Sequence, residues 1–412
     1  MLLQNDMTCL TIKLMRKLAV LALFSILFCL CPTPLSARYK EEVNIITVGP
    51  GMKIYAHYGH SCFLILRNNP EDSNNDPMFT LYNYGTFNFE KPGFVRNFLK
   101  GKLDFFLFRV DYSKELQKYV NHKRDVSRQR LNLNQEEIDK IYKFLEWNSK
   151  EENKYYKYDF LAANCSSQMV AVLEKSVGPL KYDESIRKEI TSRTYRDWIR
   201  DYLDTVPWYD LGIQIALGLN TDEKVKPEHA FFLPELTERL FDSAYLPDGR
   251  KLVDKVQMIH DAHVEHPGRP GIMTQPFIVF AIVLLFLILL SLLPGNSKLI
   301  SFFECILVAA PWVVGMMICY WWFISDHYAG DKNLNILWCN PLLIIFIVSK
   351  IFGKKQLLMW FSRIQAMLCS TAIVLLALGI QGCCSAFFPI LLMYLWIYLR
   401  NSQLLPCSPS SA

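Results

Sequence analysis

Residues 154–179 read KYYKYDFLAANCSSQMVAVLEKSVGP, and this stretch decides the fold. Apolar residues after Asn164 recur at the spacing of one helix face, and Gly178 followed by proline ends the run. The pattern predicts a helix with Cys165 in its first turn and Asn164 as its N-cap. The positive end of a helix dipole favours a thiolate there and lowers the thiol pKa. Cys165 is therefore a candidate nucleophile, and the alternative is a buried cysteine that only packs.

A thiolate nucleophile needs a base, and residues 54–66, IYAHYGHSCFLIL, supply the best candidate. We predict a strand over residues 61–66, with His60 at its start. His57 is the second choice because it lies three residues earlier, outside the strand. Alternation places Cys62 on the same strand face as His60, so a disulfide from Cys62 to Cys165 is an alternative that would consume the nucleophile.

A cysteine and histidine pair usually has a third polar group that orients the imidazole. The next predicted strand, MFTLYNYGTFNF over residues 78–89, places Asn83 in an otherwise apolar and aromatic run. A buried asparagine needs partners, so Asn83 is the first orienting candidate. Asp159, six residues before Cys165, is the second, and its simpler role is that of a cap or turn acid.

The apolar residues of the chain are unevenly distributed. The 412 residues are 51% hydrophobic and 20% charged, with a mean hydropathy of +0.14, which excludes a disordered protein. A dispersed net charge of +5 does not suggest a nucleic-acid-binding protein. Residues 39–275 read as a globular domain, whereas residues 276–400 are almost free of charge between short loops. This layout is typical of a globular domain joined to a membrane domain.

The N-terminal region has the features of an export signal. Residues 15–37, MRKLAVLALFSILFCLCPTPLSA, combine a cationic start, an apolar run and small residues after a helix-breaking Pro-Thr-Pro. We predict a signal peptide over residues 1–37, cut after Ala37, with Met15 as the candidate true start. An uncleaved signal anchor is the alternative, and it would leave the following domain on the same side of the membrane.

The C-terminal part contains five candidate membrane spans, since each needs about 20 mostly apolar residues. They cover residues 276–293, 302–324, 333–349, 364–381 and 383–399. With the domain outside, the inner loops hold six positive charges and the outer loops only Lys332. This asymmetry follows the positive-inside rule and predicts a cytoplasmic tail over residues 401–412. The inner charges are Lys298, Lys350, Lys354, Lys355, Arg363 and Arg400.

Between the signal and the spans we predict an α+β domain. Strands are expected over residues 103–110 and 126–133, and helices over 113–122 and 134–148, so that a small antiparallel sheet is flanked by helices. We assign residues 38–200 to a catalytic domain and residues 201–275 to a helical juxtamembrane region. The polar outer loop with His327 reads by default as solvated, with headgroup binding as the alternative.

No metal or cofactor is expected. A zinc site formed by His260, His263 and His266 is a weaker interpretation of this segment than a solvated juxtamembrane helix, because residues three positions apart drift around a helix. No phosphate-cradling glycine loop, HExxH helix or Cys-x-x-Cys pair occurs in the sequence.

The order histidine, polar residue and then cysteine at a helix N-terminus is reversed from ordinary papain-like enzymes. It resembles the circularly permuted NlpC/P60 group, which includes lecithin retinol acyltransferase-like enzymes. More closely, five ordered motifs and the five-span membrane half resemble the Lnb-type family, the lipoprotein N-acyltransferases. These motifs are ITVGPGMKIYAHYGHSCFLI (46–65), LYNYGTFNF (81–89), KGKLDFFL (100–107), FLEWNSKEENKYYKYDF (144–160) and NCSSQMVAVLEK (164–175).

The resemblance implies a bacterial inner-membrane enzyme with its catalytic domain in the periplasm. It would transfer an acyl chain from a phospholipid to the N-terminal amine of diacylglyceryl-cysteine lipoproteins. By the motif match, Cys165 is the nucleophile and His60 the base, while Asn83 carries over by position only. One alternative is a membrane-tethered cysteine amidase or endopeptidase acting on cell-wall peptide, against which the aromatic flanks of the site, among them Tyr82 and Tyr84, argue. Another alternative is a non-catalytic membrane scaffold.

Overall fold

The computed structural model describes residues 40–68, 77–88, 90, 92–102, 104–262, 271–293 and 295–404. The predicted signal peptide over residues 1–37 and most of the predicted tail lie outside these residues. So do His263 and His266 of the zinc hypothesis, whereas His260 is the last residue of a strand.

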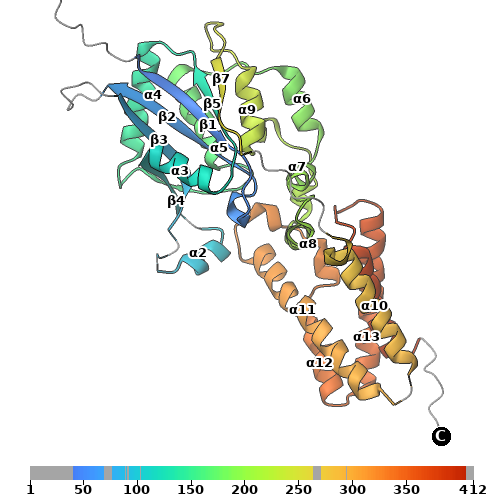
Figure 1. The fold of residues 1–412 in the computed structure, drawn as a ribbon. Coiled ribbons are helices and arrows are strands. Elements are labelled where there is room, and N and C mark those ends of the chain that lie inside the picture. The colour runs from blue at the N-terminus through green and yellow to red at the C-terminus, as the bar shows by residue number, and fades with distance from the viewer. Residues whose placement is uncertain are drawn as a thin grey trace, which may run out of the picture. The chain divides into compact units, whose positions relative to one another are not determined.

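The N-terminal half of the described chain is built around one seven-stranded sheet (Figure 1). The strand order is β6-β4-β3-β2-β1-β5-β7, and the pairings β1–β5, β3–β4, β4–β6 and β5–β7 are antiparallel. An antiparallel sheet was predicted, and its strands near residues 61–66, 78–89, 103–110 and 126–133 are present. The strands are β1 (Glu42–Val48), β2 (His60–Asn68), β3 (Pro77–Thr86), β4 (Asp104–Asp111), β5 (Val126–Leu131), β6 (Tyr155–Lys157) and β7 (Val253–His260).

Helices pack on this sheet through the side chains that alternate toward one face. Val43 and Ile45 of β1 and Phe63 and Ile65 of β2 belong to a buried core. Helix α4 (Gln135–Asn148) and helix α5 (Cys165–Val177) pack on one another and contribute to this core. The remaining helices of this half are α2 (Phe94–Leu99), α3 (Tyr112–Asn121), α6 (Glu184–Ser192), α7 (Tyr195–Asp201), α8 (Pro207–Ala216) and α9 (Pro234–Asp242).

Strand β7 differs from the helical prediction for residues 201–275. It pairs antiparallel with β5, with Gln257 opposite Arg128 and Lys255 opposite Arg130. Five consecutive residues of this edge strand are exposed, so it lacks the alternation that marks a half-buried strand. The pairing with β5 makes residues 253–260 extended. Their own sequence lacks the alternation of polar and apolar residues that would predict a strand.

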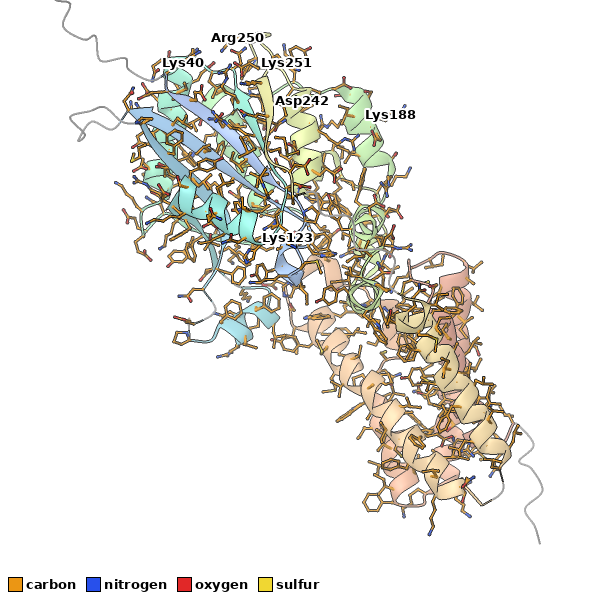
Figure 2. The ribbon with its side chains drawn as sticks, in the orientation of Figure 1. Lys40, Lys123, Lys188, Asp242, Arg250 and Lys251 are labelled. Atoms are coloured by element: carbon orange, nitrogen blue, oxygen red, sulfur yellow. The ribbon has the colours of Figure 1, made fainter. Side chains whose placement is uncertain are left out.

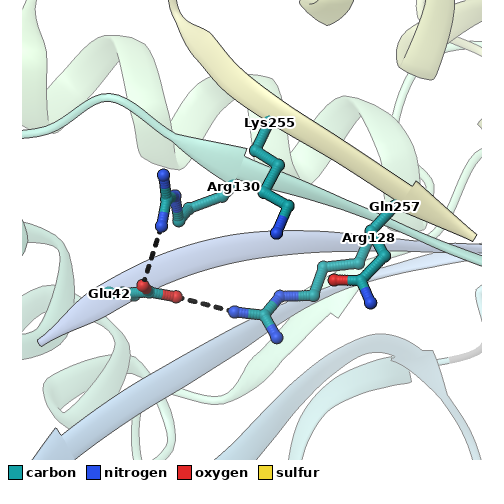
Figure 3. Close-up of a pocket in the computed structure, with 5 residues that line it drawn as sticks. All are labelled: Glu42, Arg128, Arg130, Lys255 and Gln257. Atoms are coloured by element: carbon teal, nitrogen blue, oxygen red, sulfur yellow. Dashed lines mark hydrogen bonds and ion pairs between the residues drawn. The ribbon is translucent and has the colours of Figure 1, made fainter. Parts of the chain in front are cut away.

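The solvent-facing side of this sheet edge is lined by charges. Figure 3 shows Glu42 between Arg128 and Arg130, with Lys255 and Gln257 of β7 reaching toward the same hollow. The Glu42 carboxylate pairs with Arg128 at 2.6 Å and with Arg130 at 3.3 Å. These partly exposed pairs fill the edge of the sheet, and each contributes little to stability. Figure 2 labels further charged residues, and all of them come from the chain before the apolar helices: Lys40, Lys123, Lys188, Asp242, Arg250 and Lys251.

All five predicted spans coincide with apolar helical segments in the structure. Three segments are long and apolar enough to cross a membrane: Ser297–Phe323, Leu334–Ile351 and Lys355–Ala377. Two shorter apolar helices, Pro276–Leu292 and Phe387–Asn401, flank them in the chain. In the labels of Figure 1 these helices are α10 (Pro276–Leu292), α11 (Ser297–Phe323), α12 (Ile344–Ile351), α13 (Lys355–Ala377) and α14 (Phe387–Asn401).

One acidic side chain is fully buried among these helices. Glu304 of α11 pairs with Lys350 of α12 at 2.6 Å and with Arg400 of α14 at 2.6 Å. A buried carboxylate is tolerated when it is paired and hydrogen-bonded. The three side chains therefore tie α11, α12 and α14 together.

A buried arginine joins the periphery of the sheet half to the loop before α14. Arg196 of α7 is 2% exposed and makes two hydrogen bonds to the Asp222 carboxylate, at 2.7 and 2.9 Å. It also donates to Gln214 Oε1 at 2.7 Å. The Asp222 carboxylate accepts the Gly382 N–H at 2.9 Å, and a Cβ at position 382 would overlap Arg196. Gly382 is thus required for the close approach of this loop.

The outer loop between α11 and α12 is less solvated than predicted. Asn333 and Asn335 are buried, and their side-chain amides donate to the carbonyl oxygens at the end of α8, including Ile215 O at 2.8 and 3.1 Å. They satisfy carbonyls that a helix end leaves without partners. His327 Nε2 lies 2.7 Å from Phe98 O of α2. Asn333 and Asn335 therefore serve packing, whereas Asp326 and Lys332 of the same loop are exposed.

Candidate active site

Helix α5 begins at Cys165, as the sequence predicts, and Asn164 is its N-cap. The Asn164 side-chain oxygen accepts the N–H groups of Ser166 at 2.9 Å and Ser167 at 3.1 Å. Its side-chain nitrogen donates to Phe160 O and to Phe232 O, at 2.8 and 2.7 Å. A cap that is fixed on both sides sets the direction of the first turn, and with it the position of the Cys165 sulfur.

Cys165 and His60 come together where the strand β2 begins. Burial alone would raise the pKa of the Cys165 thiol, but the charge of His60 and hydrogen bonds from His60, the Ser61 backbone and Ser166 lower it below its ordinary value. Burial would lower the pKa of His60, and the charge of Cys165 with hydrogen bonds to Cys165 and Asn83 raises it. Both directions favour a thiolate beside an imidazolium. Both side chains are partly exposed, so a reactant has access to them.

Asn83 is the orienting candidate that contacts His60. Its Oδ1 atom lies 3.1 Å from His60 Nε2, which leaves the other ring nitrogen for the sulfur. The β3–β4 register shifts between Asn83 and Thr86, and Gly85 has a left-handed φ of 87°. An added Cβ at Gly85 would lie 3.6 Å from that of Cys165. The bulge thus brings β3 close to the first turn of α5.

The other two candidates have different partners. The His57 ring nitrogens face Gly51 O at 3.2 Å and Tyr202 O at 2.6 Å, so the second-choice base is held by backbone carbonyls. Asp159 accepts the N–H groups of Leu161 and Ala162, both at 2.8 Å, in the turn before α5. Its carboxylate therefore has the role of a turn acid.

The disulfide alternative differs from the structure, whereas the aromatic residues lie in the core near the site. Cys62 and Cys165 are both free thiols, and Cys62 is fully buried. Tyr82 and Tyr84 belong to the core against which Cys165 packs, and their hydroxyls donate to Glu146 and Asn148 of α4. Their alternation along β3 directs them to the helical face of the sheet, where the Tyr84 ring lies 5.9 Å from that of Tyr156.

Two residues near Cys165 were missed by the sequence analysis. The Tyr156 hydroxyl is buried, faces the Gly85 backbone and makes no regular hydrogen bond within the described part of the chain. Burial and the charge of Cys165 raise its pKa, so it stays a protonated donor. The Arg124 guanidinium is buried, donates to Gly49 O at 2.8 Å and lies within electrostatic range of His60 and Cys165. Only the pairing of β6 with β4, and that of β5, which follows Arg124, with β1, reveals these positions.

The fold and the site define a membrane-anchored protein whose sheet domain presents a cysteine, a histidine and an asparagine together. Two family models match the chain: the Lnb N-terminal periplasmic domain over residues 38–203 and the Lnb transmembrane domain over residues 269–405. Together they cover about three quarters of the sequence. The chain belongs to the Lnb family of membrane proteins that modify lipoproteins, with a periplasmic N-terminal domain. Comparisons with curated proteins and with solved structures found no match.

Alkylation compares two cysteines of the same domain directly. Cys165 is expected to react with iodoacetamide at pH 7 about tenfold faster than free cysteine, because its lowered pKa supplies more thiolate. Cys62 is expected to stay unmodified until the protein unfolds, since it is buried and burial raises the pKa of its thiol. Peptide mass spectrometry after timed quenching measures both rates. Equal rates at the two cysteines would contradict the proposed pair.

Proposed function

We propose that this protein is a cysteine-dependent N-acyltransferase. It transfers an acyl chain from a membrane phospholipid, through a thioester on Cys165, to the N-terminal amine of diacylglyceryl-cysteine lipoproteins. The observation that carries the proposal is the contact of Cys165, His60 and Asn83 at the start of α5 in a chain of the Lnb family.

The chemistry needs two proton transfers at His60. The Cys165 thiolate attacks the ester carbonyl carbon, a carbon–sulfur bond forms, and the carbon–oxygen bond to glycerol breaks. The His60 imidazolium gives its proton to the leaving alkoxide, which departs as a lysophospholipid. The lipoprotein amine then attacks the thioester, His60 accepts the amine proton, and the carbon–sulfur bond breaks to restore the thiolate.

Negative charge on the ester oxygen needs donors that are already in place. The N–H of Cys165 lies in the first turn of α5, where helix amides have no partner within the helix. The Tyr156 hydroxyl is a second donor, because it is buried, protonated and close to Gly85 beside Cys165. Fixed donors in a site with little water stabilise such an oxyanion strongly.

The proposed function also implies an arrangement of the chain in the membrane. We infer a circularly permuted papain-like domain over residues 38–200, a juxtamembrane region over 201–275 and five crossings within 276–400. The two helices Pro276–Leu292 and Phe387–Asn401 would be the short crossings. The positive charges then place the C-terminus in the cytoplasm and the catalytic domain in the periplasm, at the inner membrane. Confinement of enzyme and both lipid-anchored substrates to one interface raises their effective concentration.

The test is mass spectrometry of lipoprotein N-terminal lipopeptides. Cells that lack their own N-acyltransferase express either this protein or Cys165→Ala. A third, amide-linked acyl chain in the wild type alone supports both the reaction and the nucleophile. Unchanged lipopeptides together with altered cell-wall peptides would overturn the proposal in favour of the amidase. A third chain added equally by Cys165→Ala would refute Cys165 as the nucleophile, and no change in lipopeptides or in cell-wall peptides would favour the scaffold.

Tyr156→Phe tests the proposed oxyanion donor. The ring and its packing against Tyr84 remain, so we expect a loss of about 10²-fold in kcat with little change in KM. Steady-state transfer rates at several donor concentrations separate the two constants. The alkylation rate of Cys165 serves as the control and should stay the same. A kcat within twofold of the wild type would exclude Tyr156 as a donor.

A further inference from the structure

An apolar groove lies between the β1–β2 loop and helix α8, and the proposed reaction has not used it. Its cavity volume is about 250 Å³, which is smaller than the pocket of a whole drug-sized ligand and suits part of an elongated one. We call it the α8 groove. Its apolar lining includes Ile54, Tyr58, Leu203, Trp208, Tyr209 and Ile213.

The α8 groove has few polar groups in its lining. Both ring nitrogens of His57 face backbone carbonyls and the Trp208 N–H is bonded to Thr274 O, so the hydroxyls of Tyr58 and Tyr209 are the remaining polar side-chain groups among the described lining residues. A peptide in such a groove would leave its backbone amides without partners, which costs free energy. An aliphatic chain has no such groups, so the lining fits a hydrocarbon.

One lining residue of the α8 groove contacts the first apolar helix. The Trp208 indole N–H donates to Thr274 O at 2.7 Å, just before α10 begins, and its ring lies 6.1 Å from that of Phe280. Tryptophan and tyrosine favour the boundary between water and hydrocarbon. Ile54, which also lines the groove, is 61% exposed. The groove is therefore expected near the hydrocarbon boundary, where an acyl chain is available.

The α8 groove shares one residue with the segment that leads into the proposed site. Tyr58 lines the groove and precedes His60 by two residues, across the turn at Gly59. The Tyr58 ring packs 5.2 Å from that of Phe160 in the turn before α5. Tyr58 therefore links the lining of the groove to the segments that hold His60 and Cys165.

A nearby cation favours a phospholipid over the lipoprotein as the occupant. Arg124 is buried, does not line the groove, and lies within electrostatic range of His60, Cys165 and Tyr55. Its positive charge acts at a distance and attracts a phosphate, whereas the diacylglyceryl group of a lipoprotein carries no charge. Together with the apolar lining, this charge favours a phospholipid.

We propose that the α8 groove holds an acyl chain of the donor phospholipid and so presents its ester to Cys165. This inference rests on the proposed function and adds the place where the donor chain binds. A substitution that fills the groove should therefore change which chain is transferred.

Photolabelling tests occupancy without catalysis. The full-length Cys165→Ala protein is placed in phosphatidylglycerol vesicles that contain a phospholipid with a diazirine on its acyl chain, and the adducts are mapped after irradiation. We expect adducts on the α8 groove, at residues such as Ile54, Leu203 and Ile213. Adducts confined to α10–α14 would overturn the proposal.

Gly212→Phe tests selection of the chain. Gly212 lines the α8 groove, and a Cβ there meets no atom within 4 Å, so the added ring enters the open space. Gly271→Phe is the matched control, because its Cβ also meets nothing and it lies outside the groove lining. We expect Gly212→Phe to shift the transferred chains by several carbons toward shorter ones or to lower transfer at least tenfold, and Gly271→Phe to match the wild type.

The two proposals fail in distinguishable ways. Wild-type chain lengths and rates in Gly212→Phe would refute the groove assignment while acyl transfer stands. Groove adducts in a protein that transfers no chain to lipoproteins would refute the proposed reaction while the phospholipid site stands.

Discussion

Cys165→Ser is expected to abolish acyl transfer, with a loss of more than about 10⁴-fold in kcat/KM. The variant changes one atom, and Asn164 still caps the helix. A serine hydroxyl nevertheless stays protonated near neutral pH, because the helix terminus and His60 lower a thiol pKa but cannot ionise an alcohol. Purified enzyme, phospholipid vesicles and a lipoprotein acceptor, followed by mass spectrometry of the lipopeptide, give the rate.

The histidine variants test the pair from the other side. His60→Ala removes the positive charge and the hydrogen bond that lower the Cys165 pKa, so its alkylation should require a higher pH. The rate then rises with pH only toward the ordinary thiol range, whereas the wild type already reacts near neutral pH. His57→Ala should leave this pH profile in place because its ring faces carbonyl oxygens. An equal shift of the pH profile of Cys165 alkylation in both variants would contradict the assignment of His60 as the base.

Arg196→Ala is expected to destabilise the protein by about 3–5 kcal/mol. The substitution leaves the Asp222 carboxylate, itself largely buried, without its bidentate partner, and leaves Gln214 Oε1 without the Arg196 donor. An uncompensated buried charge is the physical reason for the large effect. Tryptophan fluorescence during heating in detergent, read as the midpoint of unfolding, measures the loss.

The same helix region supplies a matched control for Arg196. Arg193 pairs with Asp201 at 2.8 Å, but both side chains are at least one third exposed. Arg193→Ala should therefore cost no more than about 1 kcal/mol. Combining Arg196→Met with Asp222→Asn should recover part of the lost stability, since no buried charge then remains unpaired. A midpoint for Arg196→Ala equal to that for Arg193→Ala would contradict the buried-charge explanation.

The parts of the site that sequence reasoning predicted have local causes. The start of α5 at Cys165 follows from the cap Asn164 and the apolar spacing behind it. The helix predicted over residues 134–148 is α4, and a local capping box of Asn134 and Glu137 fixes its start. Asn83 stood out as a polar residue in an apolar strand, and its partner is the predicted base. Each signal lies within a few residues of the feature that it predicts.

The parts that it missed depend on distant segments. Tyr156 stands in a run of tyrosines and lysines, and only the pairing of β6 with β4 turns its side chain toward the site. Asn333 and Asn335 are buried because α8, more than one hundred residues earlier, presents carbonyl oxygens to them. Strand β7 forms only because β5 offers an edge to it. No pattern within these segments encodes such partners.

The buried carboxylate of Glu304 has a consequence for how the membrane part is assembled during synthesis. Glu304 lies in α11, whereas its cations Lys350 and Arg400 lie in α12 and in the last helix, α14. An unpaired carboxylate in hydrocarbon is unfavourable by several kcal/mol. Glu304 has both of its cations only after the ribosome has made the end of the chain. A nascent chain that stops before Phe387 leaves Glu304 with Lys350 alone. Insertion of the final helix is therefore the step that completes charge pairing inside the bundle.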